Sequence, residues 1–212
     1  MRFLLDTGSA WLWMPGQKCT SCQAANRKYR LTKSLYNGPR SSTFRDNGIL
    51  DASQRNKRIK YALGDVRGDR VTDEVRLFRT GRKTEGTEFL YANQVGSPFN
   101  QMMPEGVLGL GPMARNTGDP IPTIEHMFKK QAFGPEGRAM FSLYFGTKGI
   151  NNSYIWFGGY SHNWLRTFIS DGAKMSVKQI ESQISWIDIP TGAKEWKVPL
   201  FSWFTQGKGE GD

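Results

Sequence analysis

The sequence has 212 residues, of which 38% are hydrophobic and 13% aromatic, which is enough apolar material for a folded core and excludes a wholly disordered chain. Its net charge of +10 comes mainly from residues 1–100, with 18 Lys and Arg against 9 Asp and Glu; residues 101–212 have 11 against 10. No run approaches the ~20 apolar residues of a membrane span, and the start, Met1–Asp6, turns acidic too soon for a signal peptide.

The basic first half could bind an acidic partner. Its Lys and Arg residues gather at 27–30 and 55–60. Neither a zinc-finger spacing nor the aromatic run of an RNA-binding sheet accompanies them. Since a solvated basic face is the ordinary explanation for such residues, we expect no nucleic acid partner.

The predicted elements are mostly short strands separated by Gly, Asn, Asp and Pro. Apolar residues 3–5 run into Asp6 as the end of a strand, and Phe141, Leu143 and Phe145 alternate with their neighbours as in a half-buried strand. Further strands are expected at 89–91, 153–157, 186–189 and 196–200. One helix is expected near 122–131, with Pro122 at its start. This pattern predicts an all-β protein.

Two cysteines, Cys19 and Cys22, form a single Cys-Thr-Ser-Cys motif. Zinc needs about four ligands, and neither histidine lies near these two in sequence, so we expect no metal site. A thioredoxin-type motif would open a helix, whereas polar and basic residues follow here and predict a loop. A small disulfide that closes a surface loop in an oxidising compartment is therefore favoured.

The strongest local signal is the segment from Leu4 to Ser9. An apolar strand delivers the Asp6 carboxylate into a tight turn, where Gly8 lets the backbone approach and Thr7 and Ser9 supply hydroxyls. Hydroxyl and backbone N–H groups can hydrogen-bond a carboxylate and fix its orientation. Taken alone, Asp-Thr-Gly is also common turn chemistry.

Several motifs occur in order along the chain, from residue 3 to about 200, and through them it resembles the pepsin-like aspartic endopeptidases. The matching segments are Asp6–Ser9, Trp11–Pro15, Ser41–Phe44, Ile59–Gly64, Glu105–Gly111, Phe141–Tyr144 and Phe157–Gly159. Cys19 and Cys22 fall where that family carries a small disulfide loop, with a tighter spacing here than in pepsin.

The resemblance implies site residues. Asp6 would be one catalytic carboxylate, supported by Thr7, Gly8 and Ser9. Tyr61 would be the tyrosine of the flap, the hairpin that closes over the substrate, and would hydrogen-bond Trp13. The remaining flap and substrate-binding residues would be Ala62, Leu63 and Gly64.

The resemblance also implies a bilobal fold, with residues 1–157 as the N-terminal catalytic lobe, lacking its first strands, and 158–212 as the beginning of a truncated C-terminal lobe. The implied protein is an aspartic endopeptidase that acts on peptides or proteins without a cofactor or metal. It would be secreted, lysosomal or vacuolar, and a monomer when complete.

Two departures keep alternatives open. The sequence has no second Asp-Thr-Gly or Asp-Ser-Gly, so we expect the partner aspartate to lie beyond Asp212 and the 212-residue chain to be inactive alone. Ala62 and Leu63 replace the usual glycine and small or polar residue of the flap tip, which would stiffen it. A non-catalytic peptide-binding protein or inactive remnant is one alternative; a dimeric, retroviral-type protease, which the two-lobed length argues against, is another.

Overall fold

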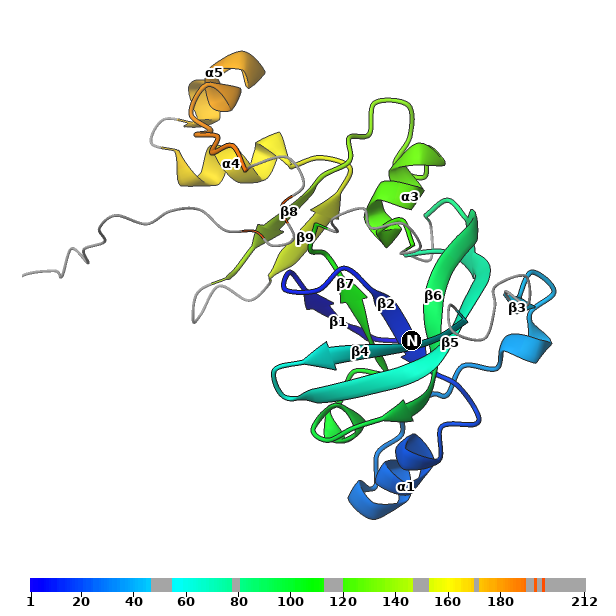
Figure 1. The fold of residues 1–212 in the computed structure, drawn as a ribbon. Coiled ribbons are helices and arrows are strands. Elements are labelled where there is room, and N and C mark those ends of the chain that lie inside the picture. Colours follow the sequence, from blue (N-terminus) through cyan, green and yellow to red (C-terminus); the bar gives the residue numbers. More distant parts are fainter. Residues whose placement is uncertain are drawn as a thin grey trace, which may run out of the picture.

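A computed structural model describes residues 1–46, 55–77, 81–112, 120–146, 153–169, 172–189, 193 and 196. In these residues the main sheet has seven strands in the order β1-β7-β2-β6-β5-β3, with β4 paired to β5 (Figure 1). The strands are β1 (Phe3–Asp6), β2 (Leu12–Pro15), β3 (Arg45–Asp46), β4 (Asn56–Tyr61), β5 (Gly64–Val75), β6 (Thr84–Val95) and β7 (Gly106–Gly109). A separate antiparallel hairpin joins β8 (Phe141–Tyr144) and β9 (Tyr154–Phe157).

The short strand β2 is buried along its whole length because both of its faces are covered. Side chains alternate between the two faces of a strand. Trp13 therefore joins one core cluster with Val66 and Leu90, whereas Leu12 and Met14 join another. The apolar run at 11–14 thus indicates a central strand with one core cluster on each face of the sheet.

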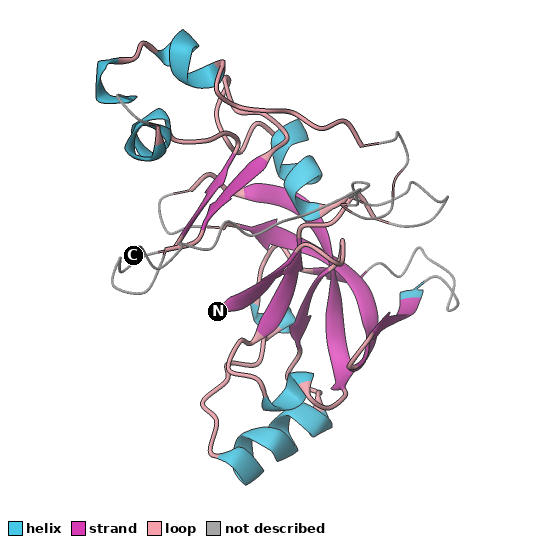
Figure 2. Cartoon of the chain, turned by 90° about the vertical axis from the view of Figure 1, so that its left-hand side faces the viewer, coloured by secondary structure: helices cyan, strands magenta, loops and turns pink. Residues whose placement is uncertain are grey.

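Three of the described α-helices lie at two ends of the molecule (Figure 1). Helix α1 (Thr20–Tyr29) lies at one end, and α4 (His162–Phe168) and α5 (Val177–Glu181) lie at the other, beyond the β8–β9 hairpin (Figures 1 and 2). Helix α3 (Thr123–Lys129) contacts β6. Single 3-10 turns are η1 (Gly38–Arg40), η2 (Phe99–Gln101) and η3 (Gly172–Lys174). In the described part of the chain, no helix is long and apolar enough to cross a membrane.

The mostly β composition, the strands near 3–5, 89–91, 141–145 and 153–157, and the helix near 122–131 are confirmed. Of the apolar residues Ile124, Met127 and Phe128, which the helical spacing places on one face, helix α3 buries the first two, whereas Phe128 is 38% exposed. The assignment of lobes at 1–157 and 158–212 stays a prediction.

The strand expected at 186–189 is wrong, since these residues have no strand partner among those described and Trp186 and Ile187 are both 68% exposed. A strand needs a neighbour to pair its backbone groups, which periodicity cannot supply. Of the strand expected at 196–200, only Trp196 is described, and it lies outside any strand; the rest falls outside the described residues. The loop expected after Cys22 is also wrong, because helix α1 lies there.

Candidate active site

The end of strand β1 places Asp6 in a tight loop. The backbone N–H of Gly8 donates to Asp6 Oδ1 at 2.9 Å, so the loop itself holds one carboxylate oxygen. Asp6 is partly exposed, and Thr7 and Gly8 are exposed. The carboxylate is thus oriented by the backbone while still open to solvent.

Strand β7 runs parallel to β1 and fixes this loop from beside it. The N–H of Leu110 donates to the carbonyl of Asp6 at 2.7 Å, and the N–H of Gly111 to that of Ser9 at 2.7 Å. A Cβ on Gly109 would lie 2.5 Å from the carbonyl carbon of Ala10. Glycine is therefore required where the two segments cross, which explains the Gly-Leu-Gly sequence physically.

Strands β4 and β5 form a hairpin whose two-residue tip is Ala62 and Leu63, between the paired residues Tyr61 and Gly64. Leu63 is 72% exposed and Ala62 is exposed as well. A Cβ on Gly64 would lie 2.6 Å from the carbonyl oxygen of Ser97, so the base of the hairpin packs closely on the segment that follows β6.

Tyr61 connects the hairpin to the loop of Asp6. The indole N–H of Trp13 donates to the Tyr61 hydroxyl at 2.9 Å. Burial raises the pKa of Tyr61; the hydrogen bond from Trp13 and the nearby hydroxyl of Ser9 partly oppose this rise, and the nearby charge of Asp6 adds to it. The phenol is therefore neutral at acid and neutral pH and available as a hydrogen-bonding group beside Asp6.

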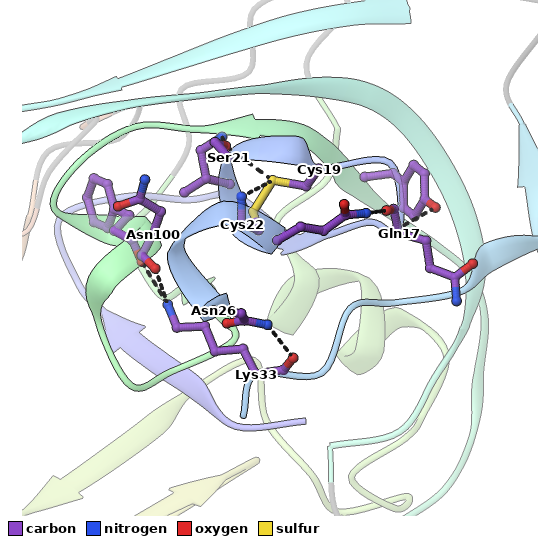
Figure 3. The surroundings of a disulfide bond; sticks show 11 residues. Gln17, Cys19, Ser21, Cys22, Asn26, Lys33 and Asn100 are labelled. Atoms are coloured by element: carbon purple, nitrogen blue, oxygen red, sulfur yellow. Dashed lines mark hydrogen bonds between the residues drawn. A yellow bond between two sulfur atoms is a disulfide. The ribbon is translucent and has the colours of Figure 1, made fainter. Parts of the chain in front are cut away.

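The disulfide between Cys19 and Cys22 is present (Figure 3). Both residues are buried in the same core cluster as Trp13. Cys19 caps helix α1, its sulfur accepting from the N–H of Cys22 at 3.3 Å. The bridge therefore fixes the start of a helix and does not merely close a surface loop.

The structure thus brings Asp6, Ser9, Trp13 and Tyr61 close together. Ala62 and Leu63, at the tip of the hairpin, are instead exposed to solvent. Sequence reasoning missed Phe99, whose ring centroid lies 4.8 Å from that of Tyr61. It also missed Lys33, a buried lysine whose Nζ donates to the carbonyls of Phe99 and Asn100 and which no sequence signal marks.

A cavity of about 580 Å³ lies beside the supporting strand and not at Asp6. Its lining is mainly apolar and includes Leu110, Ile124, Phe141, Trp186 and Trp196. Within the described ranges, no three His, Cys, Asp or Glu side chains gather so as to hold a metal ion.

Comparison with known proteins places this geometry in context. A family model described as eukaryotic aspartyl protease matches residues 1–190. The chain is 28% identical over 199 residues to pregnancy-associated glycoprotein 2 of Bos taurus, covering 94% of this chain and 44% of that protein. It is 30% identical over 173 residues to cathepsin E of Cavia porcellus (76% and 39%) and 30% identical over 167 residues to vacuolar protease A of Aspergillus fumigatus (76% and 37%). The chain spans less than half the length of these curated relatives.

Proposed function

Since the chain belongs to the eukaryotic aspartyl protease family, we propose that it forms part of an aspartic endopeptidase in which Asp6 is one of two catalytic carboxylates. The observation that carries this proposal is the placement of Asp6, which is oriented by the N–H of Gly8 and lies beside the neutral phenol of Tyr61. Thr7 and Ser9 complete the loop that supports it.

The chemistry requires two carboxylates that share a proton. Two such groups held close cannot easily both ionise, so their pKa values separate, and aspartic proteases are the standard example of this effect. The ionised carboxylate removes a proton from a water molecule, whose oxygen attacks the peptide carbonyl carbon. The protonated carboxylate donates its proton to the carbonyl oxygen. The carboxyl group that took the proton of the water then gives it to the leaving amine as the C–N bond breaks, and one hydroxyl of the intermediate returns its proton to the other carboxylate as the carbonyl re-forms. No covalent intermediate forms with the protein.

The second carboxylate, on this proposal, comes from a part of the protein outside the 212 residues. The family has a bilobal fold, and the sequence contains one Asp-Thr-Gly and no Asp-Ser-Gly. Residues 1–157 then form the N-terminal lobe and 158–212 the start of the C-terminal lobe. The 212-residue chain by itself would lack the acid–base partner of Asp6 and be inactive, and the complete protein would act as a monomer.

The β4–β5 hairpin serves as the flap in this proposal. Tyr61 and Gly64 at its base, and Ala62 and Leu63 at its tip, would contact a peptide substrate lying across Asp6, with Trp13 holding Tyr61 in place. The exposed Leu63 offers an apolar contact. A secreted, lysosomal or vacuolar site of action agrees with the disulfide and with the name of the vacuolar relative.

A second candidate function is peptide binding without turnover. The observation that favours it is the hairpin tip, where Ala62 and Leu63 supply no side-chain hydrogen bond to a substrate. Such a protein would keep the cleft and the flap but not the hydrolytic step.

The test is proteolysis of an unfolded protein substrate at acidic pH by the complete protein. We expect the wild type to cleave the substrate. Asp6→Asn should lower the rate of cleavage at least ~10³-fold, because the acid–base pair is broken. Asp46→Asn, which alters an exposed carboxylate on β3, should keep normal activity. Full activity of Asp6→Asn would refute the proposal. Binding of a peptide analogue with CH(OH) in place of the scissile carbonyl, without turnover of the parent peptide, would favour the second candidate.

A further inference from the structure

Lys33, in the segment between α1 and η1, is only 8% exposed although it carries a charge. Its Nζ donates to the carbonyl oxygens of Phe99 at 3.0 Å and Asn100 at 3.1 Å, both in η2 (Figure 3). Lysine is almost never buried unless its ammonium group is paired. The two carbonyls therefore account for the position of the side chain, and the side chain in turn fixes η2.

The turn that Lys33 holds carries Phe99 against the flap tyrosine. The ring centroids of Phe99 and Tyr61 are 4.8 Å apart, and those of Phe99 and Trp13 are 6.0 Å apart with the rings nearly perpendicular. Such tilted and edge-to-face contacts are favourable for aromatic pairs. Phe99 thus packs on both partners of the Trp13–Tyr61 hydrogen bond.

The segment around η2 also contacts the flap through its backbone. The N–H of Gly96 donates to the carbonyl of Asp65 on β5 at 2.9 Å. The carbonyl of Ser97 approaches Gly64 so closely that a Cβ there would lie 2.6 Å away. A displacement of η2 would therefore be transmitted to the base of the flap.

Helix α1 holds the backbone of Lys33, at the other end of the residue from Nζ. The side-chain amide of Asn26 donates to the Lys33 carbonyl at 3.0 Å, and the disulfide fixes the start of the same helix (Figure 3). Burial lowers the pKa of Lys33, while the negative charge of Glu105 partly opposes that change. The ammonium group has three N–H donors, of which two bind the carbonyls of Phe99 and Asn100.

We propose that Lys33 is a positioning residue of the flap: by holding the carbonyls of Phe99 and Asn100, it keeps Phe99 against Tyr61 and so sets where the Tyr61 hydroxyl lies relative to Asp6. The catalytic consequence rests on the proposed endopeptidase function, whereas the positioning itself does not. The first measurement is therefore independent of activity.

That measurement is the ¹⁵N-resolved indole N–H spectrum of the 212-residue chain, which has seven tryptophans. Trp13→Phe identifies the signal of Trp13, and Tyr61→Phe gives the shift caused by loss of its acceptor. We expect Lys33→Met to move the Trp13 signal in the same direction as Tyr61→Phe and to leave those of Trp156 and Trp164 in place. Lys18→Met, which alters an exposed lysine, should move none of them.

An unchanged Trp13 signal in folded Lys33→Met would overturn the proposal. If Lys33→Met does not fold, Lys33→Gln replaces it: its amide can still donate, but the side chain is one atom shorter and cannot hold both carbonyls, so we expect a smaller Trp13 shift in the same direction. An unchanged Trp13 signal, or movement of all seven signals together, in the variant that folds would overturn the proposal. In the complete enzyme we expect Lys33→Met to lower kcat/KM roughly tenfold, within the ~10²-fold that a ~1 Å misplacement can cost. Wild-type inactivity would refute the endopeptidase function and leave the indole result to decide the role of Lys33.

Discussion

Asp73 on β5 is a buried carboxylate whose replacement tests how the Ser41–Phe44 motif stabilises the sheet. It is 4% exposed and accepts hydrogen bonds from the hydroxyls of Tyr36, Ser41 and Thr43 and from the N–H of Glu74. Burial by itself would raise the pKa of Asp73, but these hydrogen bonds outweigh it, so the pKa lies below its ordinary value of 3.8.

Asp73→Asn keeps one acceptor oxygen and turns an amide NH₂ toward hydroxyls that were donating. A hydrogen bond to a charged group contributes ~1.5–3 kcal/mol. Loss of two of the four bonds therefore predicts a decrease of about 3 kcal/mol in the free energy of unfolding at neutral pH. The exposed Asp46→Asn should change it by less than ~0.5 kcal/mol.

The pH dependence gives the sharper test. Because the folded pKa of Asp73 is depressed, its contribution is complete above the unfolded value near 3.8 and is lost as pH falls through the folded pKa. Urea unfolding of wild type and Asp73→Asn should therefore show a difference that is largest at neutral pH and shrinks below pH 3.8. Equal stability at neutral pH, or a difference that does not change with pH, would refute this reasoning.

Two further substitutions probe the loop and the disulfide. Gly109→Ala should lower the free energy of unfolding by about 3 kcal/mol, since overpacking costs ~1–3 kcal/mol and this Cβ would meet backbone atoms. Gly159→Ala is the matched control, because a Cβ there meets nothing within 4 Å. Equal thermal midpoints of the two variants would contradict the close approach at Gly109. Replacing Cys19 and Cys22 together by serine should cost about 2 kcal/mol, the chain-entropy value for so short a ring. Urea unfolding checks this, and no loss would show that helix α1 is held without the bridge.

The sequence was sufficient for the loop at Asp6 through its residues, and for the β4–β5 hairpin through its family resemblance. An apolar strand, an aspartate and a glycine define the first, whereas the second was expected only because Ile59–Gly64 resembles the flap segment of the pepsin-like family. Helix α3 was also predictable, because the spacing of Ile124 and Met127 is helical and Pro122 marks its start. These features depend on residues close together in the chain.

Helix α1 escaped prediction because it buries only Cys22 and Ala25, so it lacks an apolar stripe. The strand expected at 186–189 failed for the opposite reason, since it has the alternation of a strand but no partner in the described structure. In both segments the outcome depends on whether the rest of the described molecule offers a partner, which the local pattern does not contain.

The sequence by itself indicated Asp6 and the turn that presents it, and its resemblance to the pepsin-like family pointed to Tyr61. Only the tertiary structure decided that Asp73 meets the Ser41–Phe44 segment and that Lys33 meets η2, across 30 and 66 residues respectively. The physical reason is that a turn is set by the backbone preferences of adjacent residues, whereas a buried charge is tolerated only where the folded sheet brings distant hydrogen-bonding groups to it.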